Sequence, residues 1–213
     1  MKRILIATSN PGKLRDFAGA ALDHGIQIAA LPNFSSLPAV VEDGPTFEAN
    51  ARKKAEHFSR LAPGEIVLAD DSGLEVDALG GAPGVHSARY AAAEPHKQET
   101  NTNDEANNAR LIRELKEVPT EKRTGRFVCV IAAARDGHTL AVFQGKADGI
   151  LLDRPRGSGG FGYDPLFYFP QIQKTFAELT AEEKANYSHR GAAFRKFLEW
   201  CEPPTTGDGS VSR

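Results

Sequence analysis

The stretch RFVCVIAAARDGHTLAVFQGK, residues 126–146, decides the fold class. It contains two runs rich in apolar residues, 126–135 and 139–146, which are the longest β-like runs of the chain. Asp136-Gly137 stands between them, and this dipeptide is typical of the tight turn of a β-hairpin. The stretch therefore predicts two long antiparallel strands.

The N-terminal half predicts strands that alternate with helices. Apolar runs at 3–7, 26–31 and 65–69 are expected strands, and the last should end at the polar segment 70–73, before a short extended piece at 74–79. The first expected helix ends at Gly25, and helical patterns begin near Pro11, Thr46, Asp104, Thr180 and Ser188. Strand–helix alternation followed by a hairpin predicts an α/β fold, with a mixed sheet flanked by helices.

Length and composition limit the class of protein. The 213 residues suit one domain, expected at 1–202, and a tail at 203–213 rich in Pro, Thr, Gly and Ser, expected to be disordered. The formal net charge of −2 argues against a nucleic-acid partner, which would need a positive surface. No run approaches 18 apolar residues, and two cysteines make no disulfide framework. We expect a cytoplasmic protein with no membrane partner.

A polar turn joins the first expected strand to the first helix. Thr8-Ser9-Asn10-Pro11-Gly12-Lys13 combines small hydroxyls, a capping asparagine, a proline at the first helical position and a lysine. The N–H groups and the dipole of a helix N-terminus favour anions. The spacing differs from that of a P-loop. The turn is either a phosphate-binding site or an ordinary capped helix start.

Adjacent carboxylates follow the expected strand at 65–69. In Asp70-Asp71-Ser72-Gly73 the two carboxylates repel unless a cation or a positive side chain neutralises them. Their hard oxygens suit Mg²⁺, which keeps several waters and bridges to substrate phosphates. Glu42 precedes the second helix, on which Asn50 and Lys54 share a face. The adjacent aspartates indicate a magnesium site, with an aspartate-rich turn as the alternative.

A glycine-aromatic segment lies near the C-terminal third of the chain, Gly157-Ser158-Gly159-Gly160-Phe161-Gly162-Tyr163-Asp164-Pro165. Glycines allow a backbone to approach a ligand closely. The rings of Phe161 and Tyr163 offer faces on which a base could stack, and Asp164 could accept a hydrogen bond from a base N–H. The alternative is a structural turn whose rings belong to the core.

A basic cluster surrounds the start of the last expected helix. Lys184 precedes Ser188-His189-Arg190-Gly191 closely enough for these side chains to reach one site. Arginine and histidine can donate hydrogen bonds to a carbonyl oxygen or to a phosphate. The alternative is a polar helix start in solvent.

Taken together, these segments describe a nucleoside triphosphate site, and the chain resembles the inosine/xanthosine triphosphate pyrophosphatase family. The resemblance runs from about residue 3 to about residue 200. It rests on blocks in the family order at Ala7–Lys13, Thr46–Ala55, Ala69–Leu74, Gly80–Val85 with Ser87–Ala91, Gly159–Pro165 and Ser188–Gly191.

The resemblance implies hydrolysis of ITP, dITP and XTP, deaminated purine nucleoside triphosphates, to the monophosphate and pyrophosphate with Mg²⁺. It implies a long curved mixed sheet, two lobes with a central substrate cleft, and a homodimer. Asp71 is the implied catalytic residue, and Asp71 and Glu42 are the implied metal ligands. The implied substrate contacts are Thr8, Ser9, Asn10, Pro11, Gly12, Lys13, Lys54, Ser72, Phe161, Gly162, Tyr163, Asp164, Lys184, His189 and Arg190.

The implied mechanism leaves two roles open for Asp71: general base, or a carboxylate that only positions the attacking water. Donors such as Arg190, His189 or a backbone N–H would face the 6-oxo oxygen of the base. Adenine has an amino group there, and such a buried mismatch gives about 10⁴-fold discrimination or more. Guanine shares the 6-oxo group, so its rejection needs a crowded edge at the 2-amino group, and no residue is evident for that role.

Three other functions remain as alternatives. The chain could be a pyrophosphatase for another damaged base, pyrimidines included. It could be a nucleotide-binding module without catalysis, although carboxylates kept together with lysines disfavour this. It could bind nucleic acid, which the near-neutral charge disfavours.

Overall fold

The computed structural model describes residues 2–21, 26–93 and 103–202. Seven strands form one sheet in the order β2-β1-β3-β4-β5-β6-β7. β1 is parallel to β2 and β3, and the remaining neighbours are antiparallel, so the predicted mixed sheet is confirmed. The strands are β1 Lys2–Ile6, β2 Ile26–Ala30, β3 Val67–Val76, β4 Thr124–Arg135, β5 His138–Leu151, β6 Phe167–Phe169 and β7 Lys174–Thr175.

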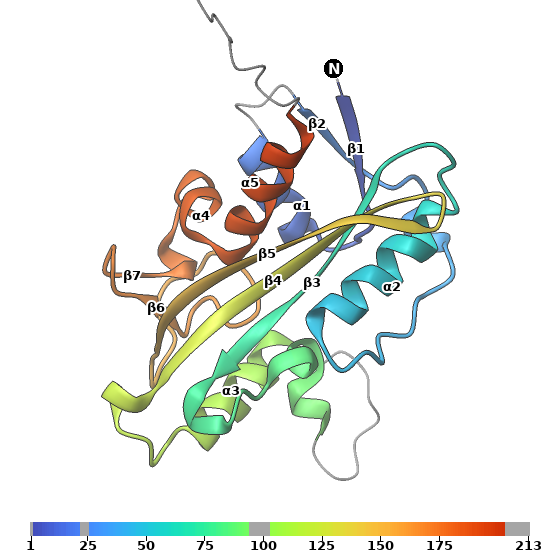
Figure 1. Ribbon diagram of the computed structural model, residues 1–213. Coiled ribbons are helices and arrows are strands. Elements are labelled where there is room, and N and C mark those ends of the chain that lie inside the picture. Colours follow the sequence, from blue (N-terminus) through green and yellow to red (C-terminus); the bar gives the residue numbers. More distant parts are fainter. Residues whose placement is uncertain (1, 22–25, 94–102, 203–213) are drawn as a thin grey trace, which may run out of the picture.

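The hairpin predicted at 126–146 is confirmed as β4 and β5, which are paired along almost their whole length. Asp136 and Gly137 have φ of 51° and 84° at the turn. Positive φ at both central residues matches the right-handed twist of the flanking strands, which is why an Asp-Gly pair suits this position. The hairpin forms the long twisted ribbon that crosses the molecule in Figure 1.

The prediction for the third strand was wrong. β3 does not end at Asp70 but continues through Asp70-Asp71-Ser72-Gly73 to Val76, paired residue by residue with β4. The long partner strand satisfies the backbone there, so tertiary pairing overrides the low strand preference of aspartate and glycine. Side chains alternate along a strand, so Asp70 and Asp71 point to opposite faces of the sheet. The two carboxylates therefore do not form a pair that shares one neutralising cation.

The helices cover both faces of the sheet (Figure 1). Phe17 and Phe194 share a core with Leu68 on the face covered by α1 and α5, whereas Phe47 shares a core with Ala69 on the face covered by α2. Each face therefore has its own hydrophobic core. The helices are α1 Pro11–Ala21, α2 Phe47–Ser59, α3 Asp104–Glu114, α4 Ala181–Tyr187 and α5 His189–Cys201.

A third hydrophobic core lies at the end of the sheet that carries Leu74. Leu111 of α3 joins Phe127 of β4 and Tyr163 there. The 3₁₀ segment η4, Gly84–Ala93, packs against β3 and α3. This end of the sheet brings α3 and η4 close to the middle of β3, where the carboxylates lie.

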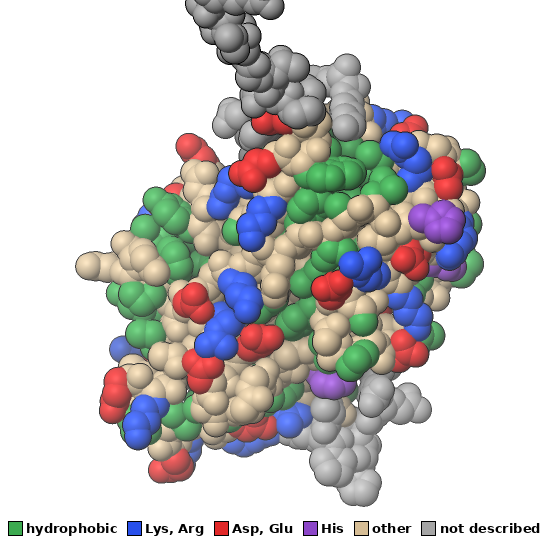
Figure 2. Space-filling view, viewed as in Figure 1, with side chains coloured by type: hydrophobic (Ala, Val, Ile, Leu, Met, Phe, Trp, Pro, Cys, Tyr) green, Lys and Arg blue, Asp and Glu red, His purple; other side chains and the backbone are tan. Residues whose placement is uncertain are grey.

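The surface and the chain ends complete the fold. On the face in Figure 2, acidic and basic side chains of the described residues are interspersed, without one broad patch of a single sign. Within the described ranges, no helix has the length and apolarity needed to cross a bilayer. The predicted helix end at Gly25 and the predicted tail at 203–213 lie outside the described residues.

Candidate active site

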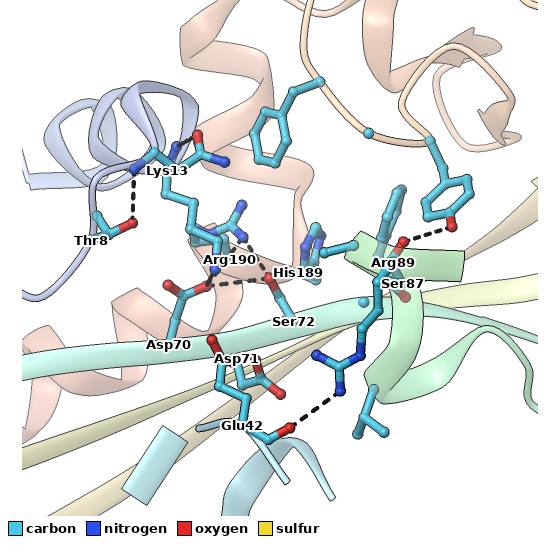
Figure 3. A pocket seen from close by; sticks show the side chains of 18 of the residues that line it. Thr8, Lys13, Glu42, Asp70, Asp71, Ser72, Ser87, Arg89, His189 and Arg190 are labelled. Carbon is cyan, nitrogen blue, oxygen red and sulfur yellow. Dashed lines mark hydrogen bonds and ion pairs between the residues drawn. The ribbon is translucent and has the colours of Figure 1, made fainter. Parts of the chain in front are cut away.

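One cavity of about 420 Å³ brings most of the predicted site residues together. It lies between the start of α1, the middle of β3, η4, the glycine-aromatic segment and the start of α5 (Figure 3). The predicted site residues on its wall are Thr8, Ser9, Asn10, Lys13, Glu42, Lys54, Asp71, Ser72, Phe161, Gly162, Tyr163, His189 and Arg190. Pro11, Gly12, Asp164 and Lys184 are not on the wall.

The N-terminus of α1 forms one end of the cavity. The Asn10 side-chain oxygen accepts hydrogen bonds from the backbone N–H of Gly12 at 2.8 Å and of Lys13 at 3.2 Å, which confirms the predicted cap. Thr8 Oγ1 accepts from the Asn10 N–H at 3.1 Å. Hydroxyls, a helix N-terminus and a lysine at one end of a cavity can bind an anion.

Asp70 is held by two cations on the α1/α5 face of the sheet. Its Oδ2 lies 3.0 Å from Lys13 Nζ and 3.2 Å from an Arg190 nitrogen. Arg190 also donates to Ser72 Oγ and to Asp16 Oδ2, each at 2.8 Å. Burial alone would raise the pKa of Asp70, but Lys13 and Arg190 outweigh it and hold that pKa far below the ordinary value.

Asp71 has different partners, on the α2 face of the sheet. Lys54 Nζ lies 3.0 Å from Asp71 Oδ1 and 2.6 Å from Glu42 Oε2, so one ammonium bridges two carboxylates. Asn50 donates its amide N–H to Asp71 Oδ2 at 3.2 Å. Burial, offset only in part by Lys54, and the neighbouring Glu42 raise the pKa of Asp71 to about 6. Burial would also raise the pKa of Glu42, but Lys54 brings it below the ordinary value.

Glu42 and Asp71 are suited to a hard divalent cation. Both carboxylates border the cavity and converge on the same ammonium group. Among the described residues, no group of three or more His, Cys, Asp and Glu side chains is arranged to hold a metal ion. Two protein carboxylates fit Mg²⁺, because this ion keeps several waters and takes further ligands from phosphates.

The glycine-aromatic segment is held by an ion pair behind the cavity wall. Asp164 Oδ2 accepts from Lys184 Nζ at 2.6 Å and from the Phe161 backbone N–H at 2.9 Å. Lys184 Nζ also lies 4.6 Å from the centre of the Phe161 ring. Asp164 and Lys184 are buried, so they position Phe161 rather than border the cavity.

Tyr163 differs from the expected stacking platform. The residue is 4% exposed, belongs to the third core, and donates its hydroxyl to the Ser87 carbonyl at 2.8 Å. A ring enclosed in this way lacks the open face that stacking requires, although the residue borders the cavity. Phe161 is less enclosed, and its ring approaches Gly12 so closely that a Cβ there would lie 2.6 Å from it.

His189 and Arg190 are buried instead of forming a polar helix start in solvent. The His189 ring stacks on Phe127 with 4.7 Å between the ring centres. Burial, reinforced by the positive charge of Arg190, lowers the pKa of His189 well below its ordinary value, so the imidazole is neutral. Within the described part of the chain, His189 Nδ1 and Arg190 Nε have no hydrogen-bond partner. Both residues border the cavity.

Comparisons with known proteins decide the family. The family model described as the Ham1 family matches residues 4–200. The chain belongs to the Ham1 family. It is 49% identical to the dITP/XTP pyrophosphatase of Geobacillus kaustophilus, over 98% of each chain, and 50% identical to that of Acidobacterium capsulatum, over 92% of this chain and 96% of the relative.

Solved structures of Ham1 proteins have the same fold. The Staphylococcus aureus Ham1 protein is 40% identical with a TM-score of 0.77, and a HAM1 protein from Coxiella burnetii is 37% identical with a TM-score of 0.78. In both comparisons 94% of this chain and 98% of the other are covered. The resemblance inferred from the motifs is therefore confirmed.

Several side chains of this site were not predicted from the sequence. Asp16 lies one helical turn after Lys13 on α1 and accepts from Arg190, a position that the i, i+3 spacing could have indicated. Asn50 orients Asp71, and its side-chain oxygen accepts from the Gly44 N–H at 2.8 Å. Asp104 and Asn107 of α3 border the cavity. No local pattern connects α3 to the other walls, because that contact depends on the tertiary fold.

Proposed function

We propose that the chain hydrolyses ITP, dITP and XTP to the nucleoside monophosphate and pyrophosphate. The observation that carries the proposal is a single cavity that brings together a lysine at a helix start, two convergent carboxylates and two buried side chains, His189 and Arg190, each with a nitrogen that has no partner among the described residues. The names of the relatives support the same reaction, since both are dITP/XTP pyrophosphatases of nearly equal length.

The triphosphate would lie along the start of α1. The Lys13 ammonium and the dipole of the α1 N-terminus would stabilise the phosphate charge, and Lys54 adds a second ammonium on the opposite side of β3. Glu42 and Asp71 would hold Mg²⁺, which supplies charge neutralisation and lowers the pKa of a bound water. These residues explain how a chain of net charge −2 accommodates a highly anionic substrate.

Asp71 would accept a proton from the water that attacks the α-phosphorus. Its pKa of about 6 lies near neutrality, which suits a group that must be ionised before the step and protonated after it. Asn50 keeps the carboxylate oriented by donating to the oxygen that Lys54 does not contact.

His189 and Arg190 would recognise the base. A neutral imidazole offers one donor and one acceptor, and a guanidinium offers only donors. Their buried nitrogens, which have no partner among the described residues, suit a ligand with a 6-oxo acceptor. Adenine would leave such donors unpaired, and unpaired buried donors lower the affinity for the wrong base.

A nucleotide panel tests the proposal. The purified chain is incubated with ITP, dITP, XTP, ATP, GTP and modified pyrimidine triphosphates, and pyrophosphate is measured with Mg²⁺ and with excess EDTA. We expect pyrophosphate release from ITP, dITP and XTP, whose bases carry a 6-oxo group and no 2-amino group, when Mg²⁺ is present. We expect no release in excess EDTA. Preference for a pyrimidine triphosphate would contradict the proposed substrate class. Unchanged pyrophosphate release in EDTA would contradict the metal requirement, and nucleotide binding without pyrophosphate release would contradict the enzymatic role.

We also propose that the chain is a homodimer in the cytoplasm, as the family resemblance implies. Leu140 and Trp200, each 44% exposed, offer apolar surface that a second copy could cover. Sedimentation velocity at micromolar concentration should give twice the mass of one chain. A single species at the monomer mass would contradict the dimer, and fractionation of cells tests the compartment.

A further inference from the structure

The strongest unassigned feature is the attachment of α3 to Gly162. Both polar backbone groups of Gly162 are bound by this helix: its N–H donates to Asp104 Oδ2 at 2.6 Å, and its carbonyl accepts from Asn108 Nδ2 at 3.1 Å. Asp104 and Asn108 are one turn apart, so their side chains leave the same side of α3. The helix therefore holds one residue of the cavity wall by two hydrogen bonds.

Gly162 has no side chain to hold it in position. Its φ is +61°, and no described atom lies within 4 Å of the place where a Cβ would be. A residue without side-chain packing is located by its backbone hydrogen bonds. The two bonds to α3 consequently hold the Gly162 peptide itself, which lies between Phe161, positioned by Asp164 and Lys184, and the buried Tyr163.

The same helix turn also holds the facing segment of the wall. Asn107 Oδ1 accepts from the Ala91 N–H at 2.8 Å, and its Nδ2 donates to the Ala88 carbonyl at 3.4 Å. Ala88, Asn107 and Gly162 all border the cavity. In addition, the hydroxyl of Tyr163 donates a hydrogen bond to the Ser87 carbonyl. One turn of α3 thus sets the distance between η4 and the glycine-aromatic segment.

We propose that Asp104 and Asn108 are specificity-determining positioning residues, which set the width of the base end of the cavity through Gly162. This rests on the proposed function, because it takes that end of the cavity to hold a purine. A slot of fixed width excludes an added exocyclic group sterically, and one group of about methyl size changes discrimination about 10- to 200-fold. Guanine differs from hypoxanthine by such a group, the 2-amino group.

The test compares variants that break one bond each with variants that keep it. Asp104→Ala removes the acceptor for the Gly162 N–H, whereas Asp104→Asn retains a carbonyl oxygen there. Asn108→Ala removes the donor to the Gly162 carbonyl. Glu105→Ala removes an exposed carboxylate from the same turn and serves as the matched control.

Two readouts are measured for each variant. Amide hydrogen exchange of residues 161–163 reports the attachment of the wall, and the ratio of dissociation constants for ITP and GTP in EDTA reports discrimination without hydrolysis. We expect faster exchange and an ITP preference reduced about tenfold in Asp104→Ala and Asn108→Ala. Asp104→Asn and Glu105→Ala should stay within about twofold of wild type.

Specific outcomes overturn the proposal. Unchanged exchange at 161–163 would show that α3 does not hold the wall, and faster exchange with an unchanged ITP/GTP ratio would show that the wall does not set discrimination. If Asn108→Ala fails to fold, the Asp104→Ala and Asp104→Asn pair at the exposed helix start decides alone. A wild type that binds ITP without hydrolysing it contradicts the proposed function only, because the affinity ratio still tests the attachment.

Discussion

Asp70 and Asp71 are neighbours in sequence but have opposite surroundings. Asp70 faces α1 and α5, where Lys13 and Arg190 keep it ionised, whereas Asp71 faces α2, where burial and Glu42 raise its pKa to about 6. The first carboxylate organises the cations of the cavity, and the second can exchange a proton near neutral pH. One residue step along a strand separates these two roles, because side chains alternate between the faces of a sheet.

The substitution Asp71→Asn should have the largest effect. It removes the proton acceptor and one of two carboxylates suited to Mg²⁺, so we expect kcat to fall about 10³-fold. The melting temperature should not fall, because the ionised carboxylate is the disfavoured form at this buried position. Steady-state pyrophosphate release and thermal melting measure both quantities, and near-wild-type kcat would contradict the assignment of Asp71.

Asp70→Asn should mainly reduce stability. It leaves Arg190, which is 1% exposed, with Asp16 as its only remaining carboxylate in the described network. Breaking a buried ion pair from one side costs about 3 kcal/mol, which lowers Tm by roughly 6–12 °C for a chain of this size. The kcat loss should be smaller than for Asp71→Asn. Equal melting temperatures for Asp70→Asn and wild type would show that the network is not stabilising.

Asn50→Ala tests whether the orientation of Asp71 matters. The substitution removes one hydrogen bond to that carboxylate, and we expect kcat to fall about tenfold, equivalent to about 1.4 kcal/mol. The KM for ITP should change less than about twofold. Arg52→Ala, which breaks only an exposed pair with Glu48 on the same helix, is the control. If both variants behaved alike, Asn50 would have no positioning role.

The pH dependence of stability should have opposite signs for the two aspartates. A depressed pKa means that Asp70 stabilises the fold above its unfolded pKa, and the contribution disappears as pH falls; the Tm deficit of Asp70→Asn should therefore shrink below about pH 4. A raised pKa means that ionisation of Asp71 destabilises the fold as pH rises from about 4 through about 6. Asp71→Asn should gain Tm relative to wild type over that interval. Melting curves from pH 3 to pH 8 give both trends, and parallel trends would contradict the comparison.

Much of the site could be predicted because its segments carry local signals. Asn10 and Pro11 indicate a helix start, and Asp136-Gly137 indicates a hairpin, since capping and turn geometry depend on a few adjacent residues. The motifs also identify the family. The wrong prediction for β3 arose because a local signal was misleading there. Local residue preference ends a strand at Asp70, whereas pairing with the distant strand β4 extends it to Val76.

Sequence information was enough to predict the mixed sheet, the helix starts, the family and the residue types needed to bind a triphosphate. These features follow from periodicity, capping and motif content over short distances along the chain. The three-dimensional contacts were needed to show that Asp70 and Asp71 face opposite sides of the sheet, that Lys184 supports Phe161 from behind the cavity wall, and that α3 holds Gly162. Such contacts join residues from 17 to 120 positions apart, and no local pattern specifies which distant side chain will neutralise a buried charge.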